Sequence, residues 1–453
     1  MRETRLRSLI TELGGELRGE DVRITGLAID GRCVGPGELF IALPGERVDG
    51  HAFVAQAAEA GAAAALVSRY VDHPLPQWRV DDPRRLMIEL ACRIRSQSPA
   101  RVIGVTGSNG KTTVKEMLAA IMGRVGRTLA TEGNRNNELG VPLTLSRLDP
   151  AHRYAVIEMG CGHPGDIGLL ASWARPVVGL VNNAGPAHLS GFGSVEAVAR
   201  CKGELFEALP EAGTAVINVD DPHAARWEQQ AAHCHVLRFG LESAKADIHG
   251  RPLGDGGLQI ALPDQTIELQ LPLPGRHNLA NAVAAAASAH AAGADPEAIA
   301  TGLAAVKPVA GRLQRRPGRS GSTLLDDSYN ANPASLTAAL SVLIAMPGAA
   351  WVVLGDMAEL GDEAAAMHRD AGEQARRMGV ERLFCVGPYA AAAAEAFGAG
   401  AEHFADVDSL IAAVQGQLER GVNLLIKGSR AAGMDRVAAA LAAGEARRDA
   451  TCC

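Results

Sequence analysis

Residues 102–117 read VIGVTGSNGKTTVKEM, in which a short apolar strand is followed by a glycine-containing turn and then by a helix. The helix carries an apolar stripe, made of Val114, Met117, Leu118, Ile121 and Val125. A strand, loop and helix in this order direct backbone N–H groups and a helix N-terminus toward phosphate oxygens. Lys111 adds a positive charge, and the Thr112 hydroxyl is a candidate Mg²⁺ ligand. The segment therefore predicts a nucleotide-binding loop in an α/β domain.

The loop does not satisfy the usual phosphate-loop pattern GxxxxGK[ST]. The position five residues before Gly110 holds Val105, where the pattern requires glycine. An alternative therefore stays open, in which a tight strand-to-helix turn carries a lone lysine. We favour nucleotide binding because GKT stands between a predicted strand and a predicted helix.

The rest of the chain divides into three blocks, as expected because 453 residues exceed the roughly 250–300 that one core accommodates. Residues 1–98 contain short α/β elements, with a strand around Leu39. Residues 99–310 predict a parallel sheet from the strand-length apolar runs RVIGVTG, YAVIEMG, VVGLVNN and TAVINVD. Residues 311–453 predict a second α/β sheet from the runs TLLDDSY, AWVVLGD, RLFCVG and VNLLIKG.

A different pattern closes the central block. Residues 258–271 read LQIALPDQTIELQL, and their alternation places six apolar residues on one face. The pattern predicts a hairpin that turns at Pro263-Asp264. We expect it to form an antiparallel appendage to the parallel sheet.

Composition excludes several classes of function. The net charge is −7 and no Lys/Arg block occurs, which argues against a nucleic-acid partner. The eight cysteines are scattered without a CxxC pair, so we expect reduced thiols. The N-terminus lacks a continuous apolar run, and Asn281 and His290 interrupt the alanine-rich stretch that starts at Leu279. We expect a cytoplasmic protein that is a monomer and does not insert into a membrane.

Five motifs beyond the loop make the chain resemble the Mur ligase family over essentially its whole length. They are GNRNNELGVPLTL from Gly133, IEMGCGHPGDI from Ile157, NNAGPAHLSGFGSVEAVARCKGELF from Asn182, GRHNLANA from Gly275 and DDSYNANPASL from Asp326. The resemblance implies a small N-terminal α/β domain for the uridine nucleotide (1–98), a central P-loop ATPase domain with a parallel sheet (99–310), and a C-terminal Rossmann-like domain (311–453).

The resemblance also implies the chemistry. ATP phosphorylates a carboxylate, an amine attacks the acyl phosphate, and ADP and phosphate are released, with ATP and Mg²⁺ as cofactors. The segments DDSYNANPASL, LGDMAELG and KGSRAAGMDRV resemble those of members that join D-alanyl-D-alanine to UDP-MurNAc-tripeptide. The expected product is the UDP-MurNAc-pentapeptide precursor of peptidoglycan.

Several residues receive catalytic and metal-binding roles by resemblance. Lys111 neutralises phosphate charge, and the expected metal ligands are Thr112, Glu158, His188 and Lys202. Lys202 lies in the motif RCKGE, where the family carries a carbamoylated lysine that acts as an anionic ligand. Cys201 replaces the small residue that usually precedes this lysine.

Nucleotide contacts are expected from one loop and from four residues that follow it in the chain. The loop residues are Thr106, Gly107, Ser108, Asn109, Gly110, Lys111, Thr112 and Thr113. Asn278 and Asn281 resemble adenine-side contacts, Arg312 a phosphate contact, and Asp327, or its neighbour Asp326, a ribose contact. Helix N-capping is the alternative role for the two asparagines.

Substrate contacts are expected in both outer blocks. Arg32 stands in GRCVGPGELF, where Gly31 replaces the usual Ser or Thr, and the loop 45–49 is expected near the uracil. Turn formation alone is the alternative there. In the third block we expect Asn330 near the substrate, and Lys427, Ser429 and Arg430 as a cationic cluster for the dipeptide carboxylate. A solvated strand end is the alternative for that cluster.

Two rival functions remain at this stage. A ligase similar to folylpolyglutamate synthetase would share the loop and the acyl phosphate. A regulatory P-loop ATPase would hydrolyse ATP without an amine acceptor.

Overall fold

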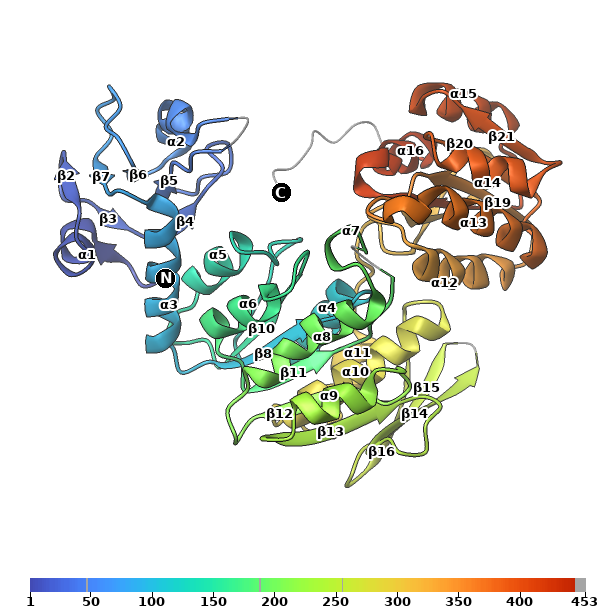
Figure 1. The fold of residues 1–453 in the computed structure, drawn as a ribbon, viewed down its shortest axis with the longest axis horizontal. Coiled ribbons are helices and arrows are strands. Elements are labelled where there is room, and N and C mark those ends of the chain that lie inside the picture. Colours follow the sequence, from blue (N-terminus) through green and yellow to red (C-terminus); the bar gives the residue numbers. More distant parts are fainter. Residues whose placement is uncertain (46–47, 187–188, 255, 445–453) are drawn as a thin grey trace.

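The computed structural model describes residues 1–45, 48–186, 189–254 and 256–444. Three large sheets follow one another along the chain, and the outer two lie on either side of the central one in Figure 1. Every large sheet is mostly parallel and carries helices, so the α/β class and the three-domain architecture predicted from the sequence are confirmed.

The N-terminal sheet has the strand order β2-β7-β6-β5-β4, and only β2 runs antiparallel to its neighbour. Its strands are β2 (Glu16–Arg18), β4 (Leu27–Ala28), β5 (Leu39–Ile41), β6 (Ala64–Val67) and β7 (Gln77–Arg79). A separate ribbon pairs β1 (Thr4–Arg5) with β3 (Arg23–Ile24). The helices are α1 (Leu6–Leu13), η1 (Gly50–Phe53), α2 (Val54–Ala60) and α3 (Pro83–Gln97). The predicted strand around Leu39 is therefore confirmed as β5.

The central sheet has nine strands in the order β16-β15-β14-β13-β12-β11-β8-β10-β9. Its parallel strands are β8 (Arg101–Thr106), β9 (Thr128–Ala130), β10 (Tyr154–Glu158), β11 (Val178–Val181), β12 (Thr214–Asn218), β13 (His235–Gly240) and β14 (Ile248–Gly254). The helices are α4 (Lys111–Val125), α5 (Gly140–Ser146), α6 (Asp166–Ala174), α7 (Leu189–Phe192), α8 (Val195–Glu207), α9 (Ala224–Gln230), α10 (Arg276–Ala291) and α11 (Pro296–Ala304). The strand β8, which leads into the loop, lies inside this sheet.

One hydrophobic core holds the phosphate loop's helix in place. The predicted stripe of α4 is buried at Val114, Met117, Leu118 and Ile121, and Val125 packs against the same core. The alanine-rich helix α10 adds its small side chains, which let it approach the sheet closely. In the part of the chain that the structure describes, no helix is long and apolar enough to cross a membrane.

The predicted hairpin forms and is antiparallel as expected, and it is added directly to the edge of the parallel sheet. Strands β15 (Gly257–Ala261) and β16 (Thr266–Gln270) pair antiparallel with Ala261 opposite Thr266. Strand β15 also pairs with β14, so the hairpin extends the nine-stranded sheet. The apolar face predicted from the alternation packs onto the core of α4 and α10, which explains why it joins the sheet.

The C-terminal sheet has the order β17-β18-β22-β19-β20-β21, and the edge strand β17 alone runs antiparallel to its neighbour. Its strands are β17 (Gln314–Pro317), β18 (Thr323–Asp327), β19 (Ala349–Gly355), β20 (Arg382–Val386), β21 (Ala401–Phe404) and β22 (Val422–Lys427). The helices are α12 (Pro333–Ile344), α13 (Ala364–Met378), α14 (Ala390–Phe397), α15 (Val407–Gln417) and α16 (Met434–Leu441), with 3-10 turns η2 (Arg319–Gly321), η3 (Gly361–Glu363) and η4 (Arg430–Ala432). Two separate apolar clusters pack on this sheet, as a Rossmann-like fold requires.

The cysteines only partly follow the sequence prediction. Free thiols are found at Cys92, Cys161, Cys201, Cys234 and Cys385. Cys33 is disulfide-bonded, which contradicts the expectation for that residue. A sequence without a CxxC pair can still form a disulfide between cysteines at other spacings. Cys452 and Cys453 lie outside the described residues.

Candidate active site

The phosphate loop connects β8 to α4 and needs glycine at its tightest point. Gly110 has a φ of 80°, and a Cβ there would come within 2.4 Å of the Asn281 amide oxygen and 2.6 Å of Asn182 Nδ2. Asn182 Nδ2 donates to Asn281 Oδ1 at 2.9 Å, and Asn281 Nδ2 donates to Asn278 Oδ1 at 3.2 Å. The loop therefore rests on a chain of buried amides.

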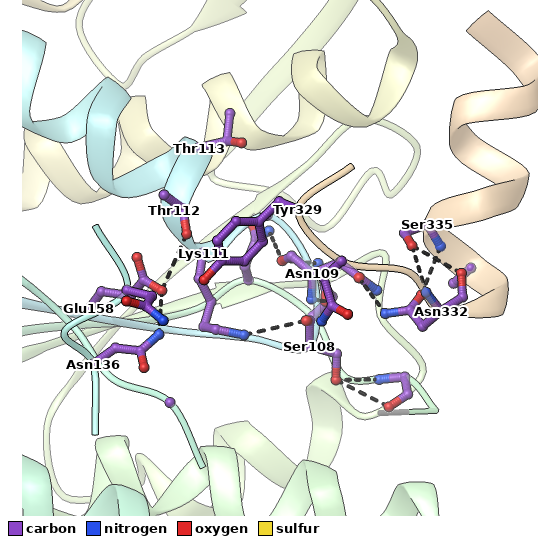
Figure 2. Close-up of a pocket in the computed structure, with 18 of the residues that line it drawn as sticks. Ser108, Asn109, Lys111, Thr112, Thr113, Asn136, Glu158, Tyr329, Asn332 and Ser335 are labelled. Atoms are coloured by element: carbon purple, nitrogen blue, oxygen red, sulfur yellow. Dashed lines mark hydrogen bonds between the residues drawn. The ribbon is translucent and has the colours of Figure 1, made fainter. Parts of the chain in front are cut away.

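Lys111 begins α4 and turns back over the loop (Figure 2). Its ammonium donates to the carbonyl oxygens of Gly107 at 2.7 Å and Ser108 at 3.4 Å. Burial, reinforced by the positive charge of Lys202, lowers the pKa of Lys111 from 10.5 to about 8. An anionic phosphate at this position would restore the charged form of the lysine.

Glu158 ends β10 and faces the start of α4 (Figure 2). Its Oε1 accepts hydrogen bonds from Asn136 Nδ2 at 2.7 Å and from the Thr112 hydroxyl at 3.3 Å. Its Oε2 is buried and has no hydrogen-bond partner among the described residues. A buried carboxylate oxygen without a partner costs free energy, and a divalent cation would satisfy it.

The oxygen atoms of Thr112 and Glu158 suit Mg²⁺, which needs few protein ligands, better than a metal whose ligands all come from the protein. The described residues contain no group of three His, Cys, Asp or Glu side chains that could hold a metal. Mg²⁺ typically takes one or two protein oxygens and completes its octahedron with water and phosphate oxygens. Thr112 Oγ1 and Glu158 Oε2 are oxygens of that kind.

The other two predicted metal ligands are placed differently. Lys202 is buried on α8, and its ammonium donates to Cys161 Sγ at 3.4 Å. Cys161 lines the cavity described next, whereas Lys202 does not reach its wall. Hydrogen bonding from Cys201, together with the charges of Lys202 and Lys111, lowers the pKa of the Cys161 thiol. His188 lies outside the described residues.

A cavity of about 1000 Å³ opens at the loop and is lined by all three parts of the chain. Arg84 of α3 comes from the N-terminal part. The predicted site residues that line it are Ser108, Asn109, Gly110, Lys111, Thr112, Thr113, Glu158, Asn278, Asn281, Arg312, Asp327, Asn330 and Lys427. The predicted loop residues Thr106 and Gly107 do not line it, and the buried Thr106 hydroxyl donates to the Met159 carbonyl at 2.8 Å. The structure thus brings most of the predicted nucleotide contacts together.

The two predicted asparagines do not cap their helix. The N-cap of α10 is Gly275, and Asn278 and Asn281 lie inside the helix. Asn278 Nδ2 donates to the Pro274 carbonyl at 2.7 Å, and Asn281 Oδ1 accepts from Asn182 beneath the loop. The capping alternative is therefore wrong. Of the two candidate aspartates, Asp327 faces the cavity, whereas Asp326 is buried and pairs with Arg316 at 3.2 Å.

The predicted cationic cluster is divided by the structure. The Lys427 ammonium is buried and pairs with Asp327 Oδ2 at 2.5 Å, so the solvated strand end is wrong for this residue. Ser429 is buried, and its backbone N–H donates to the Asp356 carbonyl. Arg430 is exposed, and its guanidinium carbon lies 5.8 Å from the centre of the Tyr329 ring. Only Lys427 of the three lines the cavity.

The predicted uridine-side residue lies away from the cavity wall. The exposed Arg32 guanidinium forms two hydrogen bonds with Asp30, at 2.9 and 2.7 Å. A Cβ at Gly31 would come within 3.2 Å of Phe53 Cβ, so a larger residue needs a shift there. In the loop 45–49, residues 46–47 lie outside the described residues.

The cavity residues to which sequence analysis gave no role include Asn136, His277, Tyr329 and Asn332, which come together only in three dimensions. All four lie in or beside motifs quoted above, which is the signal that could have found them. Asn332 caps α12 and donates from Nδ2 to Asn109 Oδ1 at 2.8 Å, joining the C-terminal part to the phosphate loop (Figure 2). Burial lowers the pKa of His277.

A phosphate loop, a buried carboxylate and a cavity reached by three α/β units are what an ATP-dependent ligase that activates a carboxylate requires. Family profiles agree: the Mur ligase family catalytic domain matches residues 23–93, the Mur ligase middle domain 105–289, and the Mur ligase glutamate ligase domain 311–430. The chain belongs to the Mur ligase family.

Comparison with individual relatives shows which members of the family the chain is similar to. The chain is 46% identical to the UDP-N-acetylmuramoyl-tripeptide--D-alanyl-D-alanine ligase of Escherichia coli strain K12, over 96% of this chain and 98% of that protein. The solved structure of MurF from Acinetobacter baumannii superposes with a TM-score of 0.87 at 33% identity, covering 97% of this chain and 98% of that one. MurF from Thermotoga maritima in complex with ADP superposes with a TM-score of 0.78 at 28% identity, covering 91% and 96%.

Proposed function

We propose that the protein joins D-alanyl-D-alanine to UDP-MurNAc-tripeptide at the expense of ATP and completes the pentapeptide precursor of peptidoglycan. The observation that carries the proposal is the single cavity that residues of all three parts line. One nucleotide, one carboxylate and one amine must meet for this reaction, and a shared cavity provides the proximity. Relatives that match over nearly the whole chain carry this activity in their names.

The expected reaction has two steps. A carboxylate oxygen of the tripeptide attacks the γ-phosphorus of ATP, and ADP leaves. The dipeptide amine then attacks the acyl carbon, its nitrogen releases a proton to solvent, and the tetrahedral intermediate expels phosphate. Lys111 and the N–H groups at the start of α4 neutralise and orient the phosphates in the first step.

We propose Thr112 and Glu158 as the residues that would hold Mg²⁺, which supplies charge neutralisation at the phosphate oxygens when bound. Lys202 would join them after its amine adds CO₂ and loses a proton to form a carbamate. The support for this step is that Lys202 is buried beside the site and that its hydrogen bond goes to a sulfur atom. His188 remains a proposed ligand by family resemblance alone.

The remaining assignments are proposals of the same kind. Asn278, Asn281, Arg312 and Asp327 would contact the nucleotide, Arg32 the uridine substrate, and Asn330, Lys427, Ser429 and Arg430 the dipeptide side. We divide the chain into domains at residues 1–98, 99–310 and 311–453, since α3 ends at Gln97 and β17 begins at Gln314. We also propose a cytoplasmic monomer without a nucleic-acid partner.

The decisive experiment incubates the purified protein with UDP-MurNAc-tripeptide, ATP, MgCl₂ and D-alanyl-D-alanine and measures product mass. We expect the pentapeptide and one ADP for each peptide bond. Release of phosphate without the dipeptide would favour a regulatory ATPase, and extension of a folate substrate by glutamate would favour the other ligase. A Lys111→Ala variant should form no product and serves as the control for a contaminating ligase.

A further inference from the structure

Tyr329 lines the cavity but has no role in the function proposed above. It follows β18, in the loop that leads to α12, and its ring is partly buried. Figure 2 shows the ring in the same cavity as Lys111 and Thr112. An aromatic ring in a cavity that binds an anion needs a physical reason, because it offers no positive charge.

The reason is the contact between Tyr329 and Arg312. The guanidinium carbon of Arg312 lies 3.8 Å from the centre of the Tyr329 ring, which is direct stacking. Other arginine–ring contacts among the described residues measure 5.2 to 5.8 Å. From this stacked position Arg312 Nη2 donates to Thr112 Oγ1 at 3.3 Å. The ring and the first turn of α4 thus fix the guanidinium between them.

The backbone on both sides of Tyr329 is fixed as well. Its N–H donates to the Gly311 carbonyl at 3.1 Å, and the Lys427 ammonium donates to the Asn330 carbonyl at 3.0 Å. Gly311 has a φ of 68°, and a Cβ there would lie 3.2 Å from the Tyr329 nitrogen. The backbone that carries the Tyr329 ring is therefore held in place by the fold.

We infer that Tyr329 is a positioning residue that holds the Arg312 guanidinium ready for the phosphates of the nucleotide. A free arginine side chain loses rotamer entropy when it is ordered, and a ring that already stacks on it removes most of that loss from the binding step. The inference rests on the proposed nucleotide role of Arg312. According to the inference, the Tyr329 ring acts by contacting Arg312 and does not contact the nucleotide.

Removing the Tyr329 hydroxyl distinguishes stacking by the ring from hydrogen bonding by the hydroxyl. Among the hydrogen bonds within the described ranges, none involves the Tyr329 hydroxyl. Tyr329→Phe keeps the stacking surface and should bind ADP as the natural protein does. Tyr329→Leu removes the π face and should weaken ADP binding about fivefold to thirtyfold, the range expected for a desolvated cation–π contact.

The test measures ADP dissociation constants by calorimetry for Tyr329→Phe, Tyr329→Leu, Arg312→Met and the double variant Arg312→Met/Tyr329→Leu. We expect Tyr329→Leu to add no further loss when Arg312 is already replaced, because the ring acts through the arginine. An equal loss in both backgrounds would show that the ring contacts the nucleotide itself, and would overturn the inference. So would a Tyr329→Phe variant as weak as Tyr329→Leu.

A matched control comes from the N-terminal sheet. The guanidinium carbons of Arg18 and Arg79 lie 5.6 Å and 5.5 Å from the centre of the Tyr70 ring. Tyr70 does not line the cavity. Tyr70→Leu should leave ADP affinity unchanged. ADP binding needs neither peptide substrate, so a failure of this inference leaves product formation by the natural protein unaffected and is distinguishable from a failure of the proposed function.

Discussion

Replacing Gly110 with alanine tests whether the amide chain beneath the loop supports nucleotide binding. The φ of 80° at Gly110 costs an L-residue roughly 1–2 kcal/mol. The added Cβ also meets Asn281 Oδ1 at 2.4 Å and Asn182 Nδ2 at 2.6 Å. Those atoms cannot simply swing away, because they are hydrogen-bonded to one another at 2.9 Å.

The magnitude follows from these two contributions. Breaking the Asn182–Asn281 hydrogen bond in a buried site adds about 1–2 kcal/mol to the backbone cost. The sum, roughly 3 kcal/mol, should lower the melting temperature of the central part by about 6–12 °C. Displacement of the loop N–H groups should weaken ADP binding roughly tenfold, the equivalent of one charged hydrogen bond. Scanning fluorimetry and calorimetry measure the two effects.

Gly123 provides the control on the same helix. A Cβ there meets nothing within 4 Å, and the position lies inside α4. Gly123→Ala should therefore stabilise the protein by about 0.5–1 kcal/mol and leave ADP affinity unchanged. If Gly110→Ala melts like the natural protein and binds ADP equally well, the packing argument for the loop is refuted.

Four further predictions concern charges. ADP affinity should fall as the pH rises through about 8, because the pKa of Lys111 is lowered from 10.5 to about 8 and the lysine then loses the charge that attracts phosphate. Lys111→Arg should abolish this pH dependence in calorimetric titrations. Glu158→Gln should raise the half-saturating Mg²⁺ concentration for product formation at least about tenfold, equal to about 1.4 kcal/mol of lost metal affinity, and an unchanged Mg²⁺ titration would contradict the assignment. Lys427→Met leaves the Asp327 carboxylate without its buried partner and should cost about 3–5 kcal/mol in urea unfolding, part of which Asp327→Asn should restore. Arg430→Ala should raise the KM for D-alanyl-D-alanine much more than the KM for ATP; equal effects would remove Arg430 from the dipeptide site.

The local elements of this fold could be predicted from sequence because their signals are local. The run VIGVTG has the length and composition of a buried strand, and the stripe of α4 repeats at helical spacing. Alternation also located the hairpin of β15 and β16, but it could not show that β15 pairs with β14. Pairing between neighbouring strands depends on which edge is free in the assembled sheet, and periodicity within one strand does not encode it.

The candidate site was predictable only as far as its motifs. Residue type and family resemblance led to Lys111, Glu158 and Arg312, which lie together at the cavity. They could not show that Lys427 pairs with Asp327 across 100 residues, so a lysine at a strand end was expected to meet the ligand directly. The contact of Arg312 with Thr112 spans 200 residues and is likewise invisible to spacing.

Asn332 shows how a residue can satisfy a local and a distant requirement at once. As the N-cap of α12, its Oδ1 accepts from the Ser335 N–H at 2.8 Å, a role that Ser, Thr or Asp would also fill. Its Nδ2 donates to Asn109 in the phosphate loop, 223 residues away. Asp could cap but not donate, and Ser is too short to do both. The choice of asparagine is therefore fixed by the contact between two domains, although the sequence around it predicts only a helix start.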